Sequence, residues 1–156
     1  ALAAIAIGCH FEVPAEAICE ALNGYIPSNN RSQLTETKDN HLIVDAYNAN
    51  PTSMMAALEN FRLMEVAHKV AILGDMKELG EGSVDEHRKI VSFLEGCGFE
   101  RIILVGDEFG KANSGFEWYK NTDDLKAKIS EEKISGKFVL IKGSNSMKLA
   151  PLKDIL

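Results

Sequence analysis

Short runs of consecutive apolar residues recur along this sequence, and they constrain the fold more than any other feature. The clearest are residues 70–73 (VAIL), 102–105 (IILV) and 138–141 (FVLI), with stretches of helical periodicity between them. A strand that is apolar at every position has to be buried on both faces, as in a parallel sheet covered by helices. We therefore expect an α/β fold, with a Rossmann-like, mostly parallel sheet that has helices on both faces.

The segments around these runs predict the remaining elements. Leu34, a polar turn at residues 38–40 and an apolar return over residues 41–47 indicate a β-hairpin, which adds an N-terminal hairpin strand to the sheet. Helices are expected over residues 52–67, 83–96 and 122–132, with a short closing helix after Ser144.

The first 28 residues differ in character from the rest. Residues 1–11 are helix formers without an N-cap, which indicates a helix cut in its middle, and a second helix over residues 14–22 stops at Asn23-Gly24. Residues 25–30 (YIPSNN) are rich in turn formers and indicate a linker. We expect a boundary here, with residues 1–28 a remnant of a preceding domain and residues 29–156 the main domain.

Composition narrows the class of protein. The 156 residues are 46% hydrophobic and 26% charged, which is typical of a folded domain, and 17 Lys and Arg against 23 Asp and Glu give a net charge of −6. This acidic balance argues against a nucleic-acid surface, whose affinity depends on neutralising phosphates. No apolar run reaches the roughly 18 residues of a membrane-spanning helix. No signal-peptide pattern occurs either, so we expect a cytoplasmic protein.

The cysteines do not indicate a metal site. Cys9, Cys19 and Cys97 share no metal-ligand spacing, and His10 beside Cys9 lacks a second pair that would complete a tetrahedral set. Because free cysteine prefers protein interiors, we expect buried thiols and no metal bound by this chain.

Polar residues follow the first expected strand, at the end where ligands bind in such a sheet. Asp45 ends this strand, and its carboxylate can accept paired hydrogen bonds from sugar hydroxyls. Asn48, Asn50 and Pro51 shape the entry to the next helix, whose N-terminus favours anions. The alternative is structural: Asn50 or Thr52 is only an N-cap, and Asp45 only a turn residue.

Two further strand ends carry candidate groups. Asp75 and Glu78 lie in a glycine-bounded loop that can fold over a ligand, although acidic loop residues are more often simply solvated. Lys142 and Ser144, on either side of a glycine, can hold a carboxylate or a phosphate. His87, in the following helix, is more typical of a structural histidine than of a ligand contact. No G-x-x-x-x-G-K-[ST] phosphate-binding loop occurs in the sequence. No G-x-G-x-x-G motif follows the first strand, which argues against a dinucleotide dehydrogenase.

Three motifs in order resemble one family. Residues 44–53 (VDAYNANPTS), 70–80 (VAILGDMKELG) and 140–147 (LIKGSNSM) closely resemble the C-terminal domain of the Mur ligases. Within that family they are most similar to the members that add D-alanyl-D-alanine to UDP-N-acetylmuramoyl-tripeptide. Residues 30–33 (NRSQ) match the arginine motif that opens this domain, and residues 1–8 resemble the last helices of the family's central ATPase domain.

The resemblance implies an ATP-dependent, amide-forming ligase of peptidoglycan precursor synthesis. The acceptor carboxylate is phosphorylated, and the amine of D-alanyl-D-alanine attacks the acyl phosphate. For the nucleotide, the resemblance implies Arg31 near the phosphates and ribose, Asp45 at the ribose hydroxyls, and Asn48 and Asn50 along the same side of the cleft.

For the dipeptide, the resemblance implies contacts from the loops at residues 75–78 and 142–146. The candidate substrate-binding residues are Asp75, Glu78, Lys142 and Ser144.

The family holds ATP and Mg²⁺ mainly in its central domain, which carries the phosphate-binding loop, the magnesium ligands and a carbamylated lysine. Because the sequence contains no such loop, we expect this chain alone to be inactive and to supply half of an active site. Two alternatives stay open. One is a non-catalytic Rossmann-like binding module. The other is the Mur ligase that adds the third residue of the stem peptide, although that type has a His in the segment where this sequence has NAN at residues 48–50.

Overall fold

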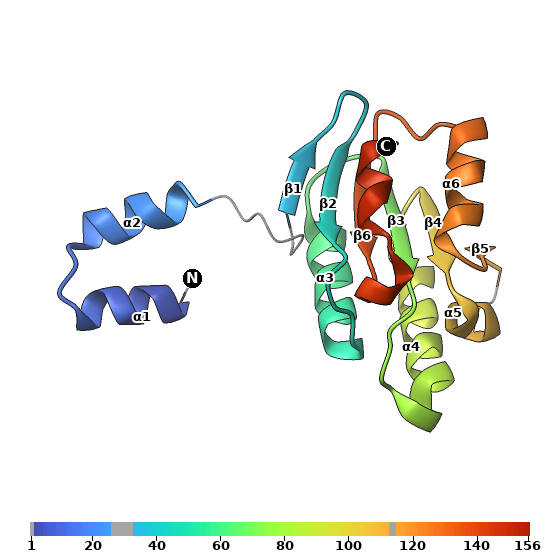
Figure 1. Cartoon of the computed structure of the whole chain (residues 1–156), viewed down its shortest axis with the longest axis horizontal. Helices are drawn as coiled ribbons and strands as arrows, with labels where there is room; N and C mark the ends of the chain where they lie inside the picture. The colour runs from blue at the N-terminus through green and yellow to red at the C-terminus, as the bar shows by residue number, and fades with distance from the viewer. Residues whose placement is uncertain (1, 26–32, 113–114) are drawn as a thin grey trace.

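The computed structural model describes residues 2–25, 33–112 and 115–156. Its centre is a six-stranded sheet in the order β1-β2-β6-β3-β4-β5 (Figure 1). β1 runs antiparallel to β2, and all other neighbouring strands are parallel, which confirms the expected sheet with its N-terminal hairpin strand. The strands are β1 (Gln33–Glu36), β2 (His41–Asp45), β3 (Lys69–Gly74), β4 (Arg101–Val105), β5 (Glu117–Tyr119) and β6 (Phe138–Lys142).

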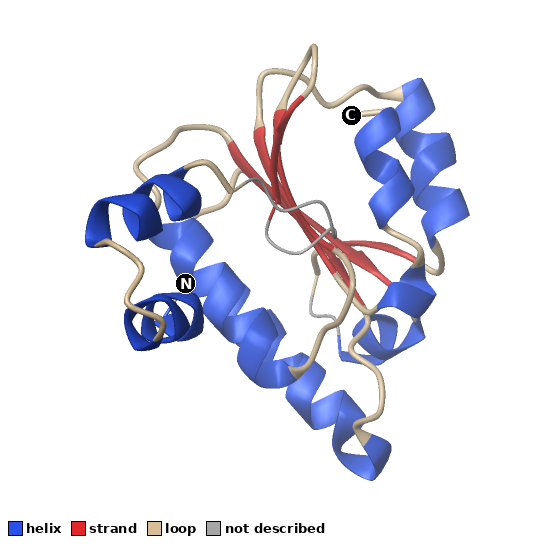
Figure 2. Ribbon diagram, turned by 60° about the vertical axis from the view of Figure 1, so that its left-hand side comes forward, coloured by secondary structure: helices blue, strands red, loops and turns tan. Residues whose placement is uncertain are grey.

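Helices cover both faces of this sheet (Figure 2). One face carries α3 (Pro51–Leu63), α4 (Ser83–Glu95), which follows the short 3-10 helix η1 (Gly80–Gly82), and α5 (Asp107–Ala112). The other face carries α6 (Thr122–Glu131) and two 3-10 helices, η2 (Asn145–Met147) and η3 (Ala150–Asp154). The closing helix expected after Ser144 is therefore a pair of 3-10 turns.

The four strands β2, β6, β3 and β4 contribute to two hydrophobic cores because successive side chains point to opposite faces of a sheet. In β3, Val70 and Ile72 pack under α6 and η3, whereas Ala71 and Leu73 pack under α3 and α4. All four side chains are almost completely buried. This double burial is the physical reason why the strands are apolar at every position.

α3 is shorter than expected. It ends at Leu63, and Met64 already has an extended backbone (φ −61°, ψ 131°). His68 then takes a left-handed conformation (φ 56°) just before β3 begins. The prediction of a helix to residue 67 was wrong because Val66 and Ala67 continue the apolar pattern after the chain has left the helix.

Two short elements were not expected from the sequence. α5 has only six residues, and β5 pairs with β4 over three. The indole Nε1 of Trp118 in β5 donates to the carbonyl of Gly106 at 2.7 Å and so fastens β5 to the start of α5. Elements this short carry too few residues to show a period, and contacts from elsewhere in the fold stabilise them.

A charged cluster joins β4 to this edge strand. The Arg101 guanidinium donates to both carboxylate oxygens of Glu117, at 2.7 and 2.8 Å, and the Tyr119 hydroxyl donates to Glu117 Oε1 at 2.6 Å. The hydrogen bonds from Arg101 lower the pKa of Glu117. Burial and the neighbouring Glu117 raise the pKa of Tyr119 to about 12.

The N-terminal helices α1 (Leu2–His10) and α2 (Ala15–Asn23) lie apart from the sheet in Figure 1. They pack against each other, with Gly8 close to Ile18, and neither helix contains a buried residue. The expectation of buried thiols is therefore wrong for Cys9 and Cys19, which are exposed, and Cys97 is only half-buried. Partial burial raises the pKa of the Cys97 thiol.

Among the helices of residues 2–25, 33–112 and 115–156, none has the length and apolar character needed to cross a membrane.

Candidate functional site

The site lies at a topological switch point of the sheet, where the connections after neighbouring strands run to opposite faces. β6 stands between β2 and β3. The chain leaves β2 and β3 toward the face of α3 and α4, but leaves β6 toward the opposite face with η2 and η3 (Figure 2). Loops that diverge in this way open a crevice at the carboxyl ends of the strands, which is the usual ligand position in an α/β sheet.

A polar pocket of about 240 Å³ occupies this crevice. Three loops line it, those that follow β2, β3 and β6. The lining residues are Tyr47, Asn48, Lys77, Glu78, Ser144, Asn145 and Ser146. The three sequence motifs therefore converge at one place. Of the residues considered from the sequence, Asn48, Glu78 and Ser144 line it directly, while Tyr47, Lys77, Asn145 and Ser146 were not singled out although they belong to the same motifs.

Asp45 and Lys142 form an ion pair beside the pocket. They stand directly opposite each other in the β2–β6 register, and Lys142 Nζ donates to Asp45 Oδ2 at 2.5 Å. The Lys142 side chain is 1% exposed and that of Asp45 is 18% exposed. Asp45 can thus reach a ligand with its remaining oxygen. Lys142, which the sequence analysis placed among the candidate substrate contacts, is paired with Asp45 in this structure.

The entry to α3 shows that Asn50 is an N-cap. Its side chain accepts from the Ser53 backbone N–H at 2.8 Å, and Ser53 Oγ accepts from the Asn50 backbone N–H at 3.2 Å. These two reciprocal hydrogen bonds form a capping box, so the expectation that Asn50 is an N-cap is confirmed. Asn48 is exposed, and its backbone carbonyl accepts from Lys142 Nζ at 3.3 Å.

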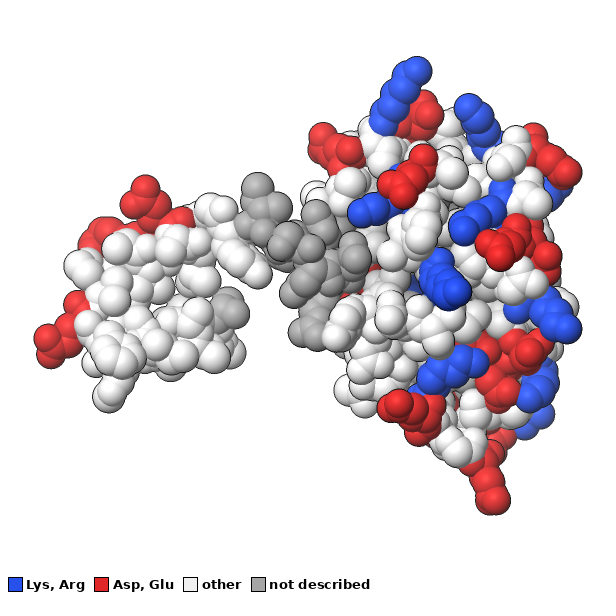
Figure 3. All heavy atoms as spheres, viewed as in Figure 1, with Lys and Arg blue, Asp and Glu red and all other residues white. Residues whose placement is uncertain are grey.

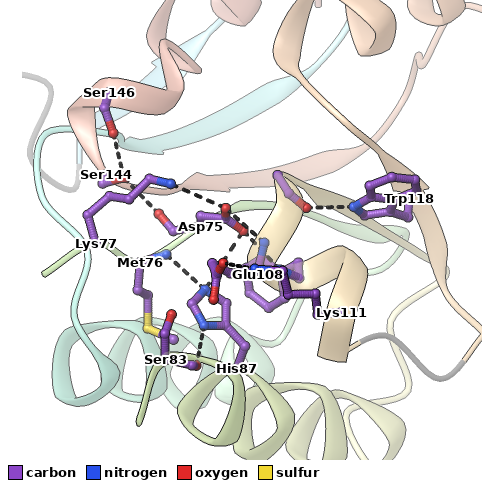
Figure 4. A network of polar contacts seen from close by, with 12 residues as sticks. Asp75, Met76, Lys77, Ser83, His87, Glu108, Lys111, Trp118, Ser144 and Ser146 are labelled. Carbon is purple, nitrogen blue, oxygen red and sulfur yellow. Dashed lines mark hydrogen bonds and ion pairs between the residues drawn. The ribbon is translucent and has the colours of Figure 1, made fainter. Parts of the chain in front are cut away.

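Asp75 is buried and connects the loop after β3 to the loops after β4 and β6 (Figure 4). Its carboxylate accepts from the backbone N–H groups of Glu108 and Phe109, at 3.1 and 2.9 Å, and so caps the N-terminus of α5. Lys77 Nζ lies 3.4 Å from Oδ2. With 1% of its surface exposed, Asp75 is neither a solvated loop residue nor open to a ligand.

The backbone of Asp75 also fixes the loop after β6. Ser144 donates to the Asp75 carbonyl twice, through its hydroxyl at 2.7 Å and through its backbone N–H at 3.2 Å. Ser144 Oγ also lies 3.2 Å from Ser146 Oγ, which brings the second serine to the pocket wall (Figure 4). One residue thus sets the relative positions of the loops that follow β3, β4 and β6.

His87 is a structural residue, as its sequence position favoured. It is completely buried, and its Nε2 accepts from the Met76 backbone N–H at 3.1 Å while Nδ1 donates to the Ser83 carbonyl at 2.7 Å. These two bonds fix the neutral tautomer with the proton on Nδ1. The histidine therefore holds the loop at residues 76–83 against α4.

Among the described residues that line the pocket, Glu78 is the one acidic residue. It is exposed and takes a left-handed backbone conformation (φ 65°), which bends the loop after Lys77. Glu108, on the other side of Asp75, has its pKa lowered by hydrogen bonds from Lys111 and Ser83.

Arg31 lies outside the described residues, as does the expected boundary between residues 28 and 29. Within the part of the chain that the structure describes, no group of three or more His, Cys, Asp or Glu side chains comes close enough together to hold a metal ion.

The sequence model of a family described as "Mur ligase, glutamate ligase domain" matches residues 30–145. A curated relative from Treponema pallidum (strain Nichols), named UDP-N-acetylmuramoyl-tripeptide--D-alanyl-D-alanine ligase, is 31% identical over 165 residues. The match covers 100% of this chain and 36% of that protein. This chain thus spans between about a fifth and little more than a third of the length of curated relatives that it matches.

Solved structures show the same fold. UDP-N-acetylmuramoylalanyl-D-glutamyl-2,6-diaminopimelate--D-alanyl-D-alanyl ligase from Acinetobacter baumannii superposes with a TM-score of 0.80 at 26% identity, covering 97% of this chain and 34% of that chain. MurF ligase from Thermotoga maritima, solved in complex with ADP, superposes with a TM-score of 0.71 over 89% of this chain and 35% of that chain. At 19% identity, this second likeness concerns the fold alone.

Proposed function

This chain belongs to the Mur ligase family, and from that premise we propose that it is the C-terminal domain of an ATP-dependent ligase that adds D-alanyl-D-alanine to UDP-N-acetylmuramoyl-tripeptide. The observation that carries the proposal is the convergence of three motif loops on one crevice at the carboxyl ends of β2, β3 and β6. The name of the Treponema pallidum relative supports the substrates.

In the proposed reaction, ATP phosphorylates the terminal carboxylate of the tripeptide and leaves as ADP. The amine of D-alanyl-D-alanine then attacks the acyl phosphate, an amide forms, and inorganic phosphate departs. Such a sequence depends on holding the nucleotide, the acyl group and the amine together, because positioning removes much of the entropic barrier.

On the nucleotide side, Asp45 accepts hydrogen bonds from the ribose hydroxyls, and its 18% exposed carboxylate fits this role. Arg31 would lie near the phosphates, as the family resemblance implies. Asn48 borders the same crevice through an exposed side chain, whereas Asn50 contributes by shaping the N-terminus of α3. As the family resemblance implies, Mg²⁺ and the ATP phosphates would be held mainly by a central domain.

On the dipeptide side, the pocket supports Glu78 and Ser144 as the residues nearest to a bound substrate. Asp75 and Lys142 would act behind the pocket wall, since both side chains are engaged within the protein. The polar lining suits a small zwitterion such as a dipeptide better than an apolar ligand. A cytoplasmic location stays a prediction.

The nucleotide assignment is tested by steady-state kinetics on the full-length ligase. Asp45→Ala removes a charged acceptor whose hydrogen bonds contribute roughly 1.5 to 3 kcal/mol, so the KM for ATP should rise about ten-fold or more. Arg31→Ala should lower kcat as well if Arg31 meets charge that develops on the phosphates in the transition state. Arg31→Lys should restore little, because an ammonium lacks the planar fork.

Asp85→Ala, an exposed carboxylate in the first turn of α4, is the matched control and should leave both constants unchanged. If Asp45→Ala and Arg31→Ala fold normally and keep the parental KM and kcat, neither residue binds the nucleotide. A non-catalytic binding module would show no ATP-dependent amide formation in the full-length protein.

A further inference from the structure

A buried lysine stands at the centre of the switch in sheet topology. Lys142 ends β6, is 1% exposed, and lies in direct register with Asp45 of β2. Its ammonium donates to the Asp45 carboxylate at 2.5 Å and to the Asn48 carbonyl at 3.3 Å. Because the side chain has almost no solvent access, any effect of Lys142 on a ligand has to pass through these two groups.

The lysine is not explained by stability alone. Taking an ammonium out of water costs free energy, and a well-packed apolar side chain at such a position is often as stable as a buried ion pair. The other buried positions at the carboxyl ends of the central strands are apolar or glycine, as at Leu73 and Val105. Among the strand residues that the structure describes, Lys142 is the one charged side chain that is buried.

The pairing leaves part of Asp45 available. Lys142 engages Oδ2, and no described residue forms a hydrogen bond with Oδ1. The carboxylate is therefore anchored through Oδ2, and 18% of the Asp45 side chain stays exposed. The second bond of the ammonium holds the carbonyl of Asn48, whose residue lines the pocket. One cation thus fixes both the carboxylate and the turn that leads into α3.

We propose that Lys142 is a positioning residue for the nucleotide: it holds Asp45 in the orientation that presents Oδ1 to the ribose and fixes the Asn48 turn beside it. The inference rests on the proposed function, because it assigns Lys142 a role only through Asp45. A ligand site needs its contact groups held in place by surrounding hydrogen bonds, and a loss of that support weakens binding even when the contact residue itself is intact.

The test is the KM for ATP and the kcat of the full-length ligase carrying Lys142→Met, which keeps the length of the side chain and removes the ammonium. The freed Asp45 carboxylate can rotate and hydrate, so the KM for ATP should rise by about three- to ten-fold with a smaller change in kcat. In an Asp45→Ala background, Lys142→Met should raise the KM for ATP hardly any further, because its effect acts through Asp45. Lys148→Met, on an exposed lysine of the same loop, is the matched control.

Lys142→Arg is a second variant that keeps a paired cation in the site, so the proposal can be tested even if Lys142→Met fails to fold. The flat guanidinium meets the carboxylate with a different geometry, so its KM for ATP should be several-fold above the parental value with little change in melting temperature. Unchanged KM values for ATP in every Lys142 variant that folds would overturn the positioning role. So would an effect of Lys142→Met that is as large in the Asp45→Ala background as in the parent.

The two proposals fail in distinguishable ways. If Asp45→Ala raises the KM for ATP but the folded Lys142 variants do not, only the positioning role is wrong. If Asp45→Ala itself leaves the KM for ATP unchanged, the nucleotide role of Asp45 is wrong, and the role of Lys142 falls with it.

Discussion

Replacing Asp75 by alanine should strongly destabilise the domain. The side chain is 1% exposed and accepts two backbone hydrogen bonds, from Glu108 and Phe109. Hydrogen bonds to a charged group contribute roughly 1.5 to 3 kcal/mol each. The N–H of Glu108 is only partly buried, and water can replace its partner, so we expect a loss of about 3 to 5 kcal/mol in the free energy of unfolding.

A loss of this size is a large fraction of the roughly 5 to 15 kcal/mol that stabilises a typical domain. Asp75→Asn keeps one acceptor oxygen but turns an N–H₂ group toward a second donor, and it should cost about half as much. The matched control is Asp85→Ala, since Asp85 also lies at a helix start but is 73% exposed. Its loss should stay below about 1 kcal/mol.

Urea denaturation of the 156-residue chain, followed by far-UV circular dichroism, measures these differences, with equal m-values showing that the transitions are comparable. A loss below about 1 kcal/mol for Asp75→Ala, similar to that of Asp85→Ala, would refute the reasoning. It would return Asp75 to the candidate substrate contacts, and a raised KM for D-alanyl-D-alanine would then be expected instead.

Three further outcomes are expected. The 156-residue chain alone should release no phosphate from ATP in the presence of D-alanyl-D-alanine and the tripeptide substrate, because its sequence has no phosphate-binding loop; measurable release would contradict this. A chain that starts at Asn29 should keep a cooperative thermal melt and a native-like far-UV spectrum, since α1 and α2 have no buried residue; a molten product would show that these helices belong to the core. In an absorbance titration, Tyr119 should ionise near pH 12 rather than near 10. Since the folded state favours the neutral phenol, the stability linked to Tyr119 should be present below pH 10 and lost as the pH rises through 12, and Tyr119→Phe should remove that step.

The sequence predicted the layers of the fold but not the order of its strands. Apolar runs such as residues 102–105 show burial on both faces, and hence a parallel sheet. The position of β6 between β2 and β3 could not be predicted, because apolar runs of similar composition do not indicate which of them are neighbours. α5 escaped prediction because the cap that stabilises it comes from Asp75, more than thirty residues away.

For the site, the sequence indicated the loops that converge on the crevice, but not the contacts that their side chains make within the protein. Asp45 and Lys142 were treated as independent ligand contacts because nothing in a sequence shows that two residues 97 positions apart face each other. Asp75 looked like a loop carboxylate because its burial is caused by neighbours from α5 and from the loop after β6. Arg31 lies outside the described residues, so its role stays a prediction.

β6 lies in the middle of the sheet but is the last strand to be synthesised, and this order affects how the domain folds. Its two neighbours, β2 and β3, are synthesised about a hundred and about seventy residues before it, yet neither pairs with the other. Until β6 emerges, both strands have an open edge lined by apolar residues such as Val44 and Ile72, and open edges of this kind favour association between chains. Pairing over such sequence distances also makes folding slow. A nascent chain that stops before β6 should therefore be the form most prone to aggregate and most dependent on chaperones.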